Sequence, residues 1–288
     1  MYKHLFGPVP SRRLGTSLGI DLVTHKICSL DCVYCECGKT TYLTIDRKEY
    51  VLYKDVVREL EHFWEHNLAP DYITFSGSGE PCLNVNIGRV IAYVKKKRPS
   101  IKVAVLTNGT LLSLKKVRQD LGLADIVIPS IDAAVVNSFV KINRPCSKIN
   151  LETYLEGLVE FSREYKGEIC LEILILPGYN DSSNDLLRLK EAIRTIDPKL
   201  VQLNTLDRPG AVASIRSATQ KELENVKRLL AFNNICIVAK IENKPLDIPR
   251  DDISSVIMET IHRRPCTALD LLKILSVDEQ RLNKILQK

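Results

Sequence analysis

Residues 28–37 read CSLDCVYCEC, and the fold class and chemistry of the chain can be inferred outward from this stretch. It holds four of the nine cysteines; the other five lie scattered at positions 82, 146, 170, 236 and 266. An odd total with one tight group does not match the disulfide framework of a secreted protein. In a reducing compartment such a group indicates metal binding or redox chemistry.

The cysteine spacing is C-x3-C-x2-C, with the aromatic residue Tyr34 directly before the third cysteine. Three thiolates on one loop can ligate three irons of a cubane cluster, which leaves the fourth iron open to a chelating cofactor. We therefore predict that Cys28, Cys32 and Cys35 bind a [4Fe–4S] cluster. The alternative is a zinc site that also uses Cys37, although zinc ligands usually come as two separated pairs. On the cluster hypothesis Cys37 is a neighbouring thiol and not a ligand.

Short apolar segments and amphipathic segments alternate along the chain around this loop. Strands are predicted at residues 17–22, 72–76, 103–107, 126–130, 169–175, 200–203 and 236–240. Helices are predicted at residues 54–65, 84–97, 151–165, 183–195 and 219–232. The alternation predicts parallel βαβ units, and so an α/β protein with either an open doubly wound sheet or a full or partial barrel. In each of these folds the reactive site lies at the carboxyl ends of the strands.

A glycine-rich turn that carries a carboxylate follows the second predicted strand. Residues 71–81 read DYITFSGSGEP, and the turn itself comprises Gly77, Ser78, Gly79 and Glu80. Glycines let the backbone approach a ligand closely, and a carboxylate accepts hydrogen bonds from an ammonium group. The turn is therefore a candidate ligand site.

Polar residues also mark the next three predicted strands. Asn108 follows residues 103–107, while Ser130 and Asp132 lie at the end of residues 126–130. Glu172 interrupts the apolar strand at 169–175, and because an unpaired buried carboxylate is costly it has to face solvent, a cation or a polar ligand. These side chains are candidates for the same site.

The motif C-x3-C-x-aromatic-C after an early strand resembles the signature of the radical S-adenosylmethionine (SAM) superfamily. The stretches PSRRLG (10–15), SLGI (17–20), SGSGEP (76–81) and LTNG (106–109) resemble one group of it, the Fe–S oxidoreductases related to the wybutosine-pathway enzymes of tRNA. The resemblance covers about residues 5–250 and implies a partial (β/α)6 barrel with a [4Fe–4S] cluster and SAM. In this superfamily an electron donor such as flavodoxin or ferredoxin reduces the cluster. SAM bound to the open iron is then cleaved to a 5′-deoxyadenosyl radical, which abstracts a hydrogen from the substrate.

The resemblance also implies roles for the candidate residues. The turn at Gly77, Ser78, Gly79 and Glu80 would bind the SAM amino group, and Tyr34 would lie near the adenine. Asn108, Ser130 and Asp132 would face the active site. Glu172 would lie near the ribose and methionine groups of SAM. Lys141 or Arg144 would pair with the SAM carboxylate, or else lie in a solvated loop. Gln202, Asn204 and Arg208 would contact the substrate.

The composition is that of an ordinary globular protein, with 45% hydrophobic and 26% charged residues. No apolar run approaches the length of a membrane span, and the first residues lack the apolar core of a signal peptide, so we expect a cytoplasmic protein without a membrane partner. The net charge of +6 permits an anionic partner such as RNA but does not require one.

The C-terminal residues 251–288 differ from the rest, because no strand is predicted among them. Three short helices are predicted there, at 252–262, 267–275 and 278–287. We therefore predict a core domain at 1–250 and a small helical module at 251–288, similar to a helix-turn-helix or an incomplete winged helix.

Three functions are compatible with these features. The first is a radical SAM enzyme that takes a hydrogen from an unidentified small molecule or peptide. The second is a tRNA base-modifying enzyme of the wybutosine type, although those enzymes carry further cysteines ahead of the SAM motif and here none precedes Cys28. The third is an Fe–S regulator that senses redox state and cleaves no SAM. The glycine-rich turn at Glu80 favours the enzymes, because a sensor needs no SAM-amine site.

Overall fold

A computed structural model of the chain describes residues 2–11, 14–238, 257, 268, 271–272 and 279–286. Its centre is an eight-stranded sheet of order β1-β2-β5-β6-β7-β8-β9-β10. The strands are β1 (Leu5–Ser11), β2 (Gly15–Ile20), β5 (Tyr72–Phe75), β6 (Lys102–Thr107), β7 (Ile126–Pro129), β8 (Glu168–Leu174), β9 (Leu200–Asn204) and β10 (Ile235–Ile237). All neighbours from β2 to β10 pair in parallel, and only β1 runs antiparallel. The protein is thus α/β with a mostly parallel sheet.

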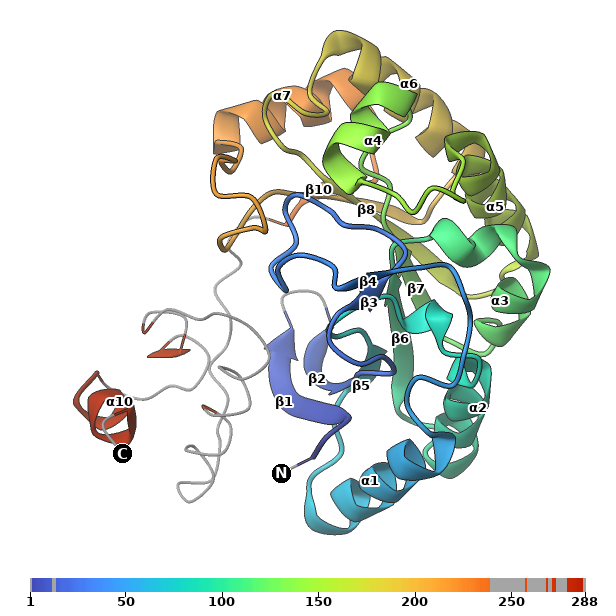
Figure 1. The fold of residues 1–288 in the computed structure, drawn as a ribbon, viewed down its shortest axis with the longest axis vertical. Coiled ribbons are helices and arrows are strands. Elements are labelled where there is room, and N and C mark those ends of the chain that lie inside the picture. The colour runs from blue at the N-terminus through green and yellow to red at the C-terminus, as the bar shows by residue number, and fades with distance from the viewer. Residues whose placement is uncertain are drawn as a thin grey trace.

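Helices connect the parallel strands and form an arc around one side of the sheet (Figure 1). They are α1 (Tyr53–His66), α2 (Ile87–Lys97), α3 (Lys115–Asp120), α4 (Val136–Asn143), α5 (Leu151–Glu164), α6 (Ser183–Ile196) and α7 (Gln220–Leu230). Local sequence fixes several helix starts. Asn150 caps α5, and Thr219 and Glu222 form a reciprocal capping box at α7.

The sequence-based strand prediction matches the parallel part of the sheet. Each of the seven predicted strands overlaps one strand from β2 to β10, and these strands are rich in buried Val, Ile and Leu, as expected under a layer of helices. The antiparallel edge strand β1 was not predicted. Its sequence, LFGPVPS, contains a glycine and two prolines, which are depleted in strands, and it pairs with β2 through an irregular register.

One helix prediction needs correction, and two short helices were not predicted. The helix predicted at 84–97 begins only at Ile87, because residues Pro81–Leu83 form a short 3-10 turn (η1) in which the Glu80 carboxylate accepts the Cys82 N–H. The short helices α3 and α4 were not predicted at all. They have only 6 and 8 residues, too few to repeat an amphipathic period clearly.

The cysteine loop lies over the carboxyl ends of the strands and carries two short strands of its own. These are β3 (Ile27–Cys28) and β4 (Tyr42–Leu43), which pair in parallel. The loop continues into α1, so that it crosses the centre of the molecule before the chain joins the outer arc of helices (Figure 1).

The C-terminal predictions fall mostly outside the described residues. One helix there is described, α10 (Glu279–Leu286), and it lies within the helix predicted at 278–287. Among the residues that the structure describes, no helix combines the length and the apolar character needed to cross a membrane.

Candidate active site

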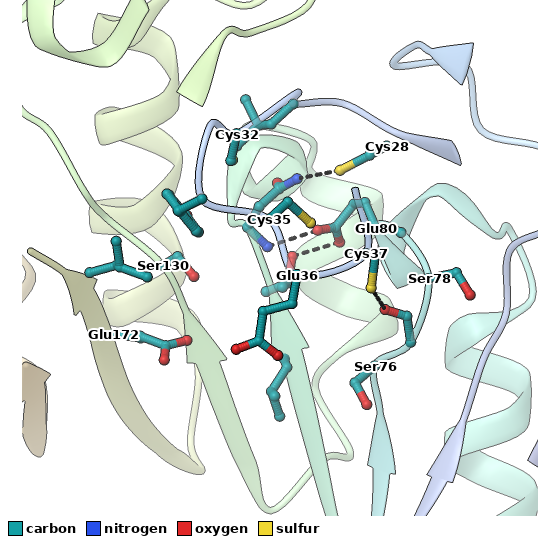
Figure 2. A pocket seen from close by; sticks show the side chains of 18 of the residues that line it. Cys28, Cys32, Cys35, Glu36, Cys37, Ser76, Ser78, Glu80, Ser130 and Glu172 are labelled. Carbon is teal, nitrogen blue, oxygen red and sulfur yellow. Dashed lines mark hydrogen bonds between the residues drawn. The ribbon is translucent and has the colours of Figure 1, made fainter. Parts of the chain in front are cut away.

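A cavity of about 420 Å³ opens at the carboxyl ends of the strands, beneath the cysteine loop. Eleven of the residues predicted from the sequence line it: Cys28, Cys32, Tyr34, Cys35, Gly77, Ser78, Gly79, Glu80, Asn108, Ser130 and Glu172. The candidates Asp132, Lys141, Arg144, Gln202 and Arg208 do not. Figure 2 shows Ser130 and Glu172 on one side of this cavity and Ser76 and Ser78 on the other, with the cysteines and Glu80 between them. A volume of this size suits a small-molecule ligand.

The cysteine loop is held by backbone contacts to distant elements. Val33 N–H donates to the carbonyl of Ile142 at the end of α4, at 2.9 Å, and Asp31 N–H donates to the carbonyl of Asn143 at 3.0 Å. Within the loop, the Lys26 ammonium donates to the Gly38 carbonyl at 2.6 Å. The loop is thus fixed at several points, which holds its three cysteines in place at the cavity.

The three thiols differ in their electrostatic surroundings. Burial raises the pKa of Cys28 to about 12, to which the nearby Glu80 carboxylate contributes. Burial likewise raises the pKa of Cys32 well above its ordinary value, with the Asp132 carboxylate adding to the effect. The pKa of Cys35 instead falls to about 5, because the Cys37 side chain hydrogen-bonds to it, an effect that burial opposes and Lys26 assists.

The thiol set fits a cubane cluster better than a single ion. Among the described residues no three His, Cys, Asp or Glu side chains converge as ligands of one metal ion. In a cubane each thiolate binds a different iron, so the sulfurs need not converge on one point. Cys28, Cys32 and Cys35 form no disulfide within the described part of the chain, which leaves these three thiols available.

The glycine-rich turn packs directly against the strand that leads into Cys28. The N–H of Glu80 donates to the carbonyl of Ile27 at 3.1 Å, and a Cβ atom built on Gly79 would lie 1.8 Å from that carbonyl oxygen. On the other side, the Asp21 carboxylate accepts from the N–H and the hydroxyl of Ser78, at 2.9 and 2.6 Å. Gly79 therefore allows a close approach that fixes Glu80 beside the first cysteine.

We expect Gly79→Ala to lower the free energy of unfolding by about 3 kcal/mol, because strand β3 and the turn are forced apart at the backbone. Gly122→Ala is the matched control. Its added Cβ would meet only the Gln119 carbonyl oxygen at 3.2 Å and its φ is not left-handed, so we expect a change below about 1 kcal/mol. Urea unfolding of both variants measures the difference, and equal stabilities would contradict the close packing at Gly79.

Glu80 is a buried carboxylate, with 2% of its surface exposed. Its Oε1 accepts from the Cys82 N–H at 3.0 Å and from the Thr107 hydroxyl at 2.7 Å, and its Oε2 accepts from the Asn108 N–H at 2.7 Å. Burial raises its pKa, and these hydrogen bonds oppose the shift. The carboxylate is therefore oriented by donors from its own turn and from the end of β6.

Ser130 and Glu172 face each other across neighbouring strands. They form a parallel bridge that extends the pairing of β7 with β8. The Glu172 Oε1 accepts from Asn204 Nδ2 at 3.1 Å, and the Ser130 carbonyl accepts from the Tyr154 hydroxyl. Asn204, which was proposed as a substrate contact, also lines the cavity. These residues form the side of the cavity that lies away from the glycine-rich turn.

Asp132 lies behind the cavity wall rather than in it. Its Oδ2 accepts from the Tyr34 hydroxyl at 2.5 Å and from Asn143 Nδ2 at 2.7 Å, and its Oδ1 accepts from the Leu174 N–H at 2.9 Å. Burial raises its pKa to about 6, which these three donors oppose. The carboxylate joins the cysteine loop to strands β7 and β8, and the structure thus gives it a positioning role instead of the predicted ligand contact.

The remaining polar candidates from the sequence do not line the cavity. The Lys141 ammonium donates to the Gly178 carbonyl at 2.7 Å and lies 4.6 Å from the centre of the Tyr179 ring, while Arg144 lies 4.0 Å from Asp31. Gln202 and Arg208 are also absent from the cavity lining, and Arg208 lies 4.0 Å from Glu36.

Two carboxylates of the lining were not among the predicted site residues. Glu36 lies between the third and fourth cysteines of the loop, and Asp21 follows the end of β2. The position of Asp21 offered a signal, because it stands at the carboxyl end of a predicted parallel strand, where ligands bind in such sheets.

Comparison with known proteins identifies the family of the chain. The model of the Radical SAM superfamily matches residues 22–189, a range that includes the cysteine loop, the glycine-rich turn and strands β3 to β8. The fold is also that of TYW1, in a solved structure with a lysine–pyruvate adduct bound. That similarity has a TM-score of 0.55 at 19% identity and covers 80% of this chain and 76% of the other.

Two curated relatives are similar over most of this chain. A protein of Brachyspira hyodysenteriae named GTPase Obg is 35% identical over 99% of this chain, which spans only 42% of that longer protein. A UPF0026 protein of Methanocaldococcus jannaschii is 35% identical over 82% of this chain and 73% of its own length. The sequence-based resemblance is thereby confirmed: the chain belongs to the radical SAM superfamily and, within it, to the UPF0026 proteins.

Proposed function

We propose that Cys28, Cys32 and Cys35 hold the [4Fe–4S] cluster of this enzyme and that the cavity beside them binds SAM. The observation that carries the proposal is the meeting of the three thiols and the Glu80 carboxylate in one cavity of about 420 Å³. As a radical SAM enzyme the chain uses both cofactors. When bound, they supply the one-electron cleavage of SAM that yields a 5′-deoxyadenosyl radical.

Glu80 is suited to bind the SAM ammonium group. Only one of its three protein hydrogen bonds ends on Oε2, so that this oxygen keeps an acceptor position for a ligand donor. The buried carboxylate lies in a region of low dielectric, where its attraction to a cation is stronger than in water. Gly77 and Gly79 let the backbone of the turn approach the same ligand.

The opposite part of the cavity is suited to position a substrate. Leu106, Ile128 and Leu174 provide apolar lining there, while Ser130, Glu172 and Asn204 provide hydrogen-bonding groups. Apolar lining excludes water from a reactive intermediate, and a few polar groups orient the reacting carbon–hydrogen bond. We propose that the substrate enters from this side and that Tyr34 contributes to the adenine site.

The proposal extends to the domain organisation of the chain and to its compartment. We propose that the described residues 14–238 form the catalytic core as a partial (β/α)6 barrel. Most of the small helical module predicted at 251–288 lies outside the described residues. An oxygen-sensitive cluster held by the thiols of Cys28, Cys32 and Cys35 requires a reducing compartment. This favours the cytoplasm and an electron donor such as flavodoxin or ferredoxin.

A small molecule or a peptide is the substrate class that we favour, since the described cavity accommodates a ligand of limited size. A tRNA base is the second candidate. The net charge of +6 supports it, because a basic surface attracts the phosphate backbone of RNA. Membership of an enzyme superfamily leaves the redox-sensing regulator without support.

Cleavage of SAM tests the proposal directly. Anaerobically reconstituted and reduced protein is expected to convert SAM to 5′-deoxyadenosine, measured by chromatography with mass detection. Protein without reductant is the control and is expected to form none. If fully cluster-loaded, reduced protein neither binds nor cleaves SAM, the proposed function is wrong.

A further inference from the structure

The thiol of Cys28 has a dedicated hydrogen-bond donor from outside the cysteine loop. Asn108 Nδ2 donates to Cys28 Sγ at 3.5 Å and to the Ser29 hydroxyl at 2.8 Å. Its Oδ1 accepts from the N–H and the hydroxyl of Thr110, at 3.0 and 2.7 Å. Because both ends of the amide have partners of the correct polarity, the N–H group is held toward the sulfur.

The thiol of Cys32 has a second such donor, Asn143 at the end of α4. Asn143 Nδ2 donates to Cys32 Sγ at 3.5 Å and to Asp132 Oδ2 at 2.7 Å. The other end of the amide, Oδ1, is buried and has no hydrogen-bond partner among the described residues. A flipped amide would place that oxygen against the Asp132 carboxylate, so the observed orientation is enforced even though it leaves a buried acceptor unsatisfied.

The third group is a buried lysine near the Cys35 thiol, and it carries a full charge. Lys26 is 2% exposed, and its ammonium donates to the Gly38 carbonyl at 2.6 Å. The ammonium also lies close enough to Cys35, Cys28 and Cys32 to interact electrostatically with each of these thiols. A buried ammonium is costly unless it is paired, which points to an anionic partner at the three sulfurs.

The geometry points to a common role for these three donors: we propose that Asn108, Asn143 and Lys26 set the reduction potential of the cluster. This inference rests on the proposed function, since it takes the three cysteines as cluster ligands. Reduction adds one electron from an external one-electron donor and breaks no bond. N–H groups and a positive charge at the sulfurs stabilise the more negative reduced form and so raise the potential. The donors act through the thiolates, and neither Lys26 nor Asn143 lines the cavity.

Two variants test the proposal, Lys26→Met and Asn143→Leu, which remove one donor each with little change in side-chain length. Asn108 is left unchanged because it also lines the cavity. The matched controls are Lys39→Met, on the exposed part of the same loop, and Asn137→Leu, on the exposed face of α4. All proteins are reconstituted anaerobically, normalised by iron content and titrated potentiometrically without SAM, with the reduced cluster followed by electron paramagnetic resonance.

We expect Lys26→Met to lower the equilibrium constant for reduction about tenfold, which corresponds to about 59 mV for a one-electron couple. Asn143→Leu is expected to lower it about threefold, since it removes a neutral donor. Both controls should stay within about twofold of the wild type, because exposed groups are screened by solvent. Lys26→Arg, which keeps the charge and a donor, is expected to restore most of the Lys26→Met loss.

The proposal is overturned if both variants carry full clusters with the potential of the wild type. It is also overturned if neither variant retains a cluster while the controls do, because the donors then serve assembly and not tuning. If Asn143→Leu is the only one of the two variants that retains a cluster, its reduction potential decides the question: a lowered potential supports the proposal, and the potential of the wild type overturns it. Wild-type protein that binds no cluster would instead refute the proposed function. If the wild type cleaves SAM but the variants have the reduction potential of the wild type, this inference alone is refuted.

Discussion

Cys32→Ala yields a folded protein that retains less than about a tenth of the wild-type iron and forms no 5′-deoxyadenosine, because a cubane held by only three thiolates loses one of its protein-bound corners. The fold should persist, since the substitution removes one sulfur from a partly exposed position. The measurement is iron and sulfide per chain after anaerobic reconstitution, with far-ultraviolet circular dichroism to confirm folding. A folded Cys32→Ala protein with normal iron content would refute the ligand assignment.

Cys37→Ala is the matched control in the same loop. Cys37 also lines the cavity, but its sulfur lies 3.7 Å from the Gly77 carbonyl, and it acts on the cluster loop through its hydrogen bond to Cys35. We expect this variant to keep more than about half of the wild-type iron, as one weak contact to a ligand is lost and no ligand is removed. Loss of iron equal to that of Cys32→Ala would favour a site with four thiolates.

The parallel sheet and the position of the site follow from short-range sequence patterns. Strands β5, β6, β7 and β8 are short buried runs bounded by polar turns, and such runs predict strands covered by helices without knowledge of their neighbours. Parallel pairing then brings their carboxyl ends to one edge. That is why Glu80, Asn108 and Ser130, which are separated by dozens of residues, line one cavity as the sequence predicts.

The partners of buried polar groups do not follow from such patterns. Asp132 was expected to face a ligand because it follows a strand. Its carboxylate oxygens instead accept hydrogen bonds from Tyr34, Asn143 and the Leu174 N–H. Asn143 reaches a cysteine that lies 111 residues earlier in the chain. Contacts of that separation depend on how α4 packs on the cysteine loop, and no local spacing encodes it.

Edge strand β1 shows the same limit for the fold. Its residues have low strand propensity, and the strand exists because β2 offers an open edge for pairing. The pairing also brings Phe6, Gly7 and Val9 to the cavity wall, so that part of the site comes from a segment that the sequence did not identify as structured.

Glu80→Gln is expected to weaken SAM binding roughly 30- to 150-fold, the equivalent of about 2–3 kcal/mol for the loss of a charged partner in a hydrogen bond. The amide keeps the shape of the side chain but removes the charge that attracts the SAM ammonium. It also places an NH₂ group against one of three protein donors, the Cys82 N–H, the Thr107 hydroxyl or the Asn108 N–H, and this should lower the free energy of unfolding by about 1–3 kcal/mol.

Thr107→Val separates these two effects. It removes one hydrogen bond to Glu80 Oε1 and one hydroxyl from the cavity lining, while the carboxylate and its charge remain. We expect a SAM dissociation constant within about fivefold of the wild type, because the loss of one neutral hydrogen bond costs about 1 kcal/mol and acts indirectly. Binding is measured by equilibrium dialysis on cluster-loaded protein, with iron content as a check that both variants retain the cluster. Equal weakening by both variants would mean that Glu80 shapes the turn and does not bind the ammonium. The SAM-amine site would then have to be sought at Asp21, Glu36 or Glu172, the other carboxylates of the cavity.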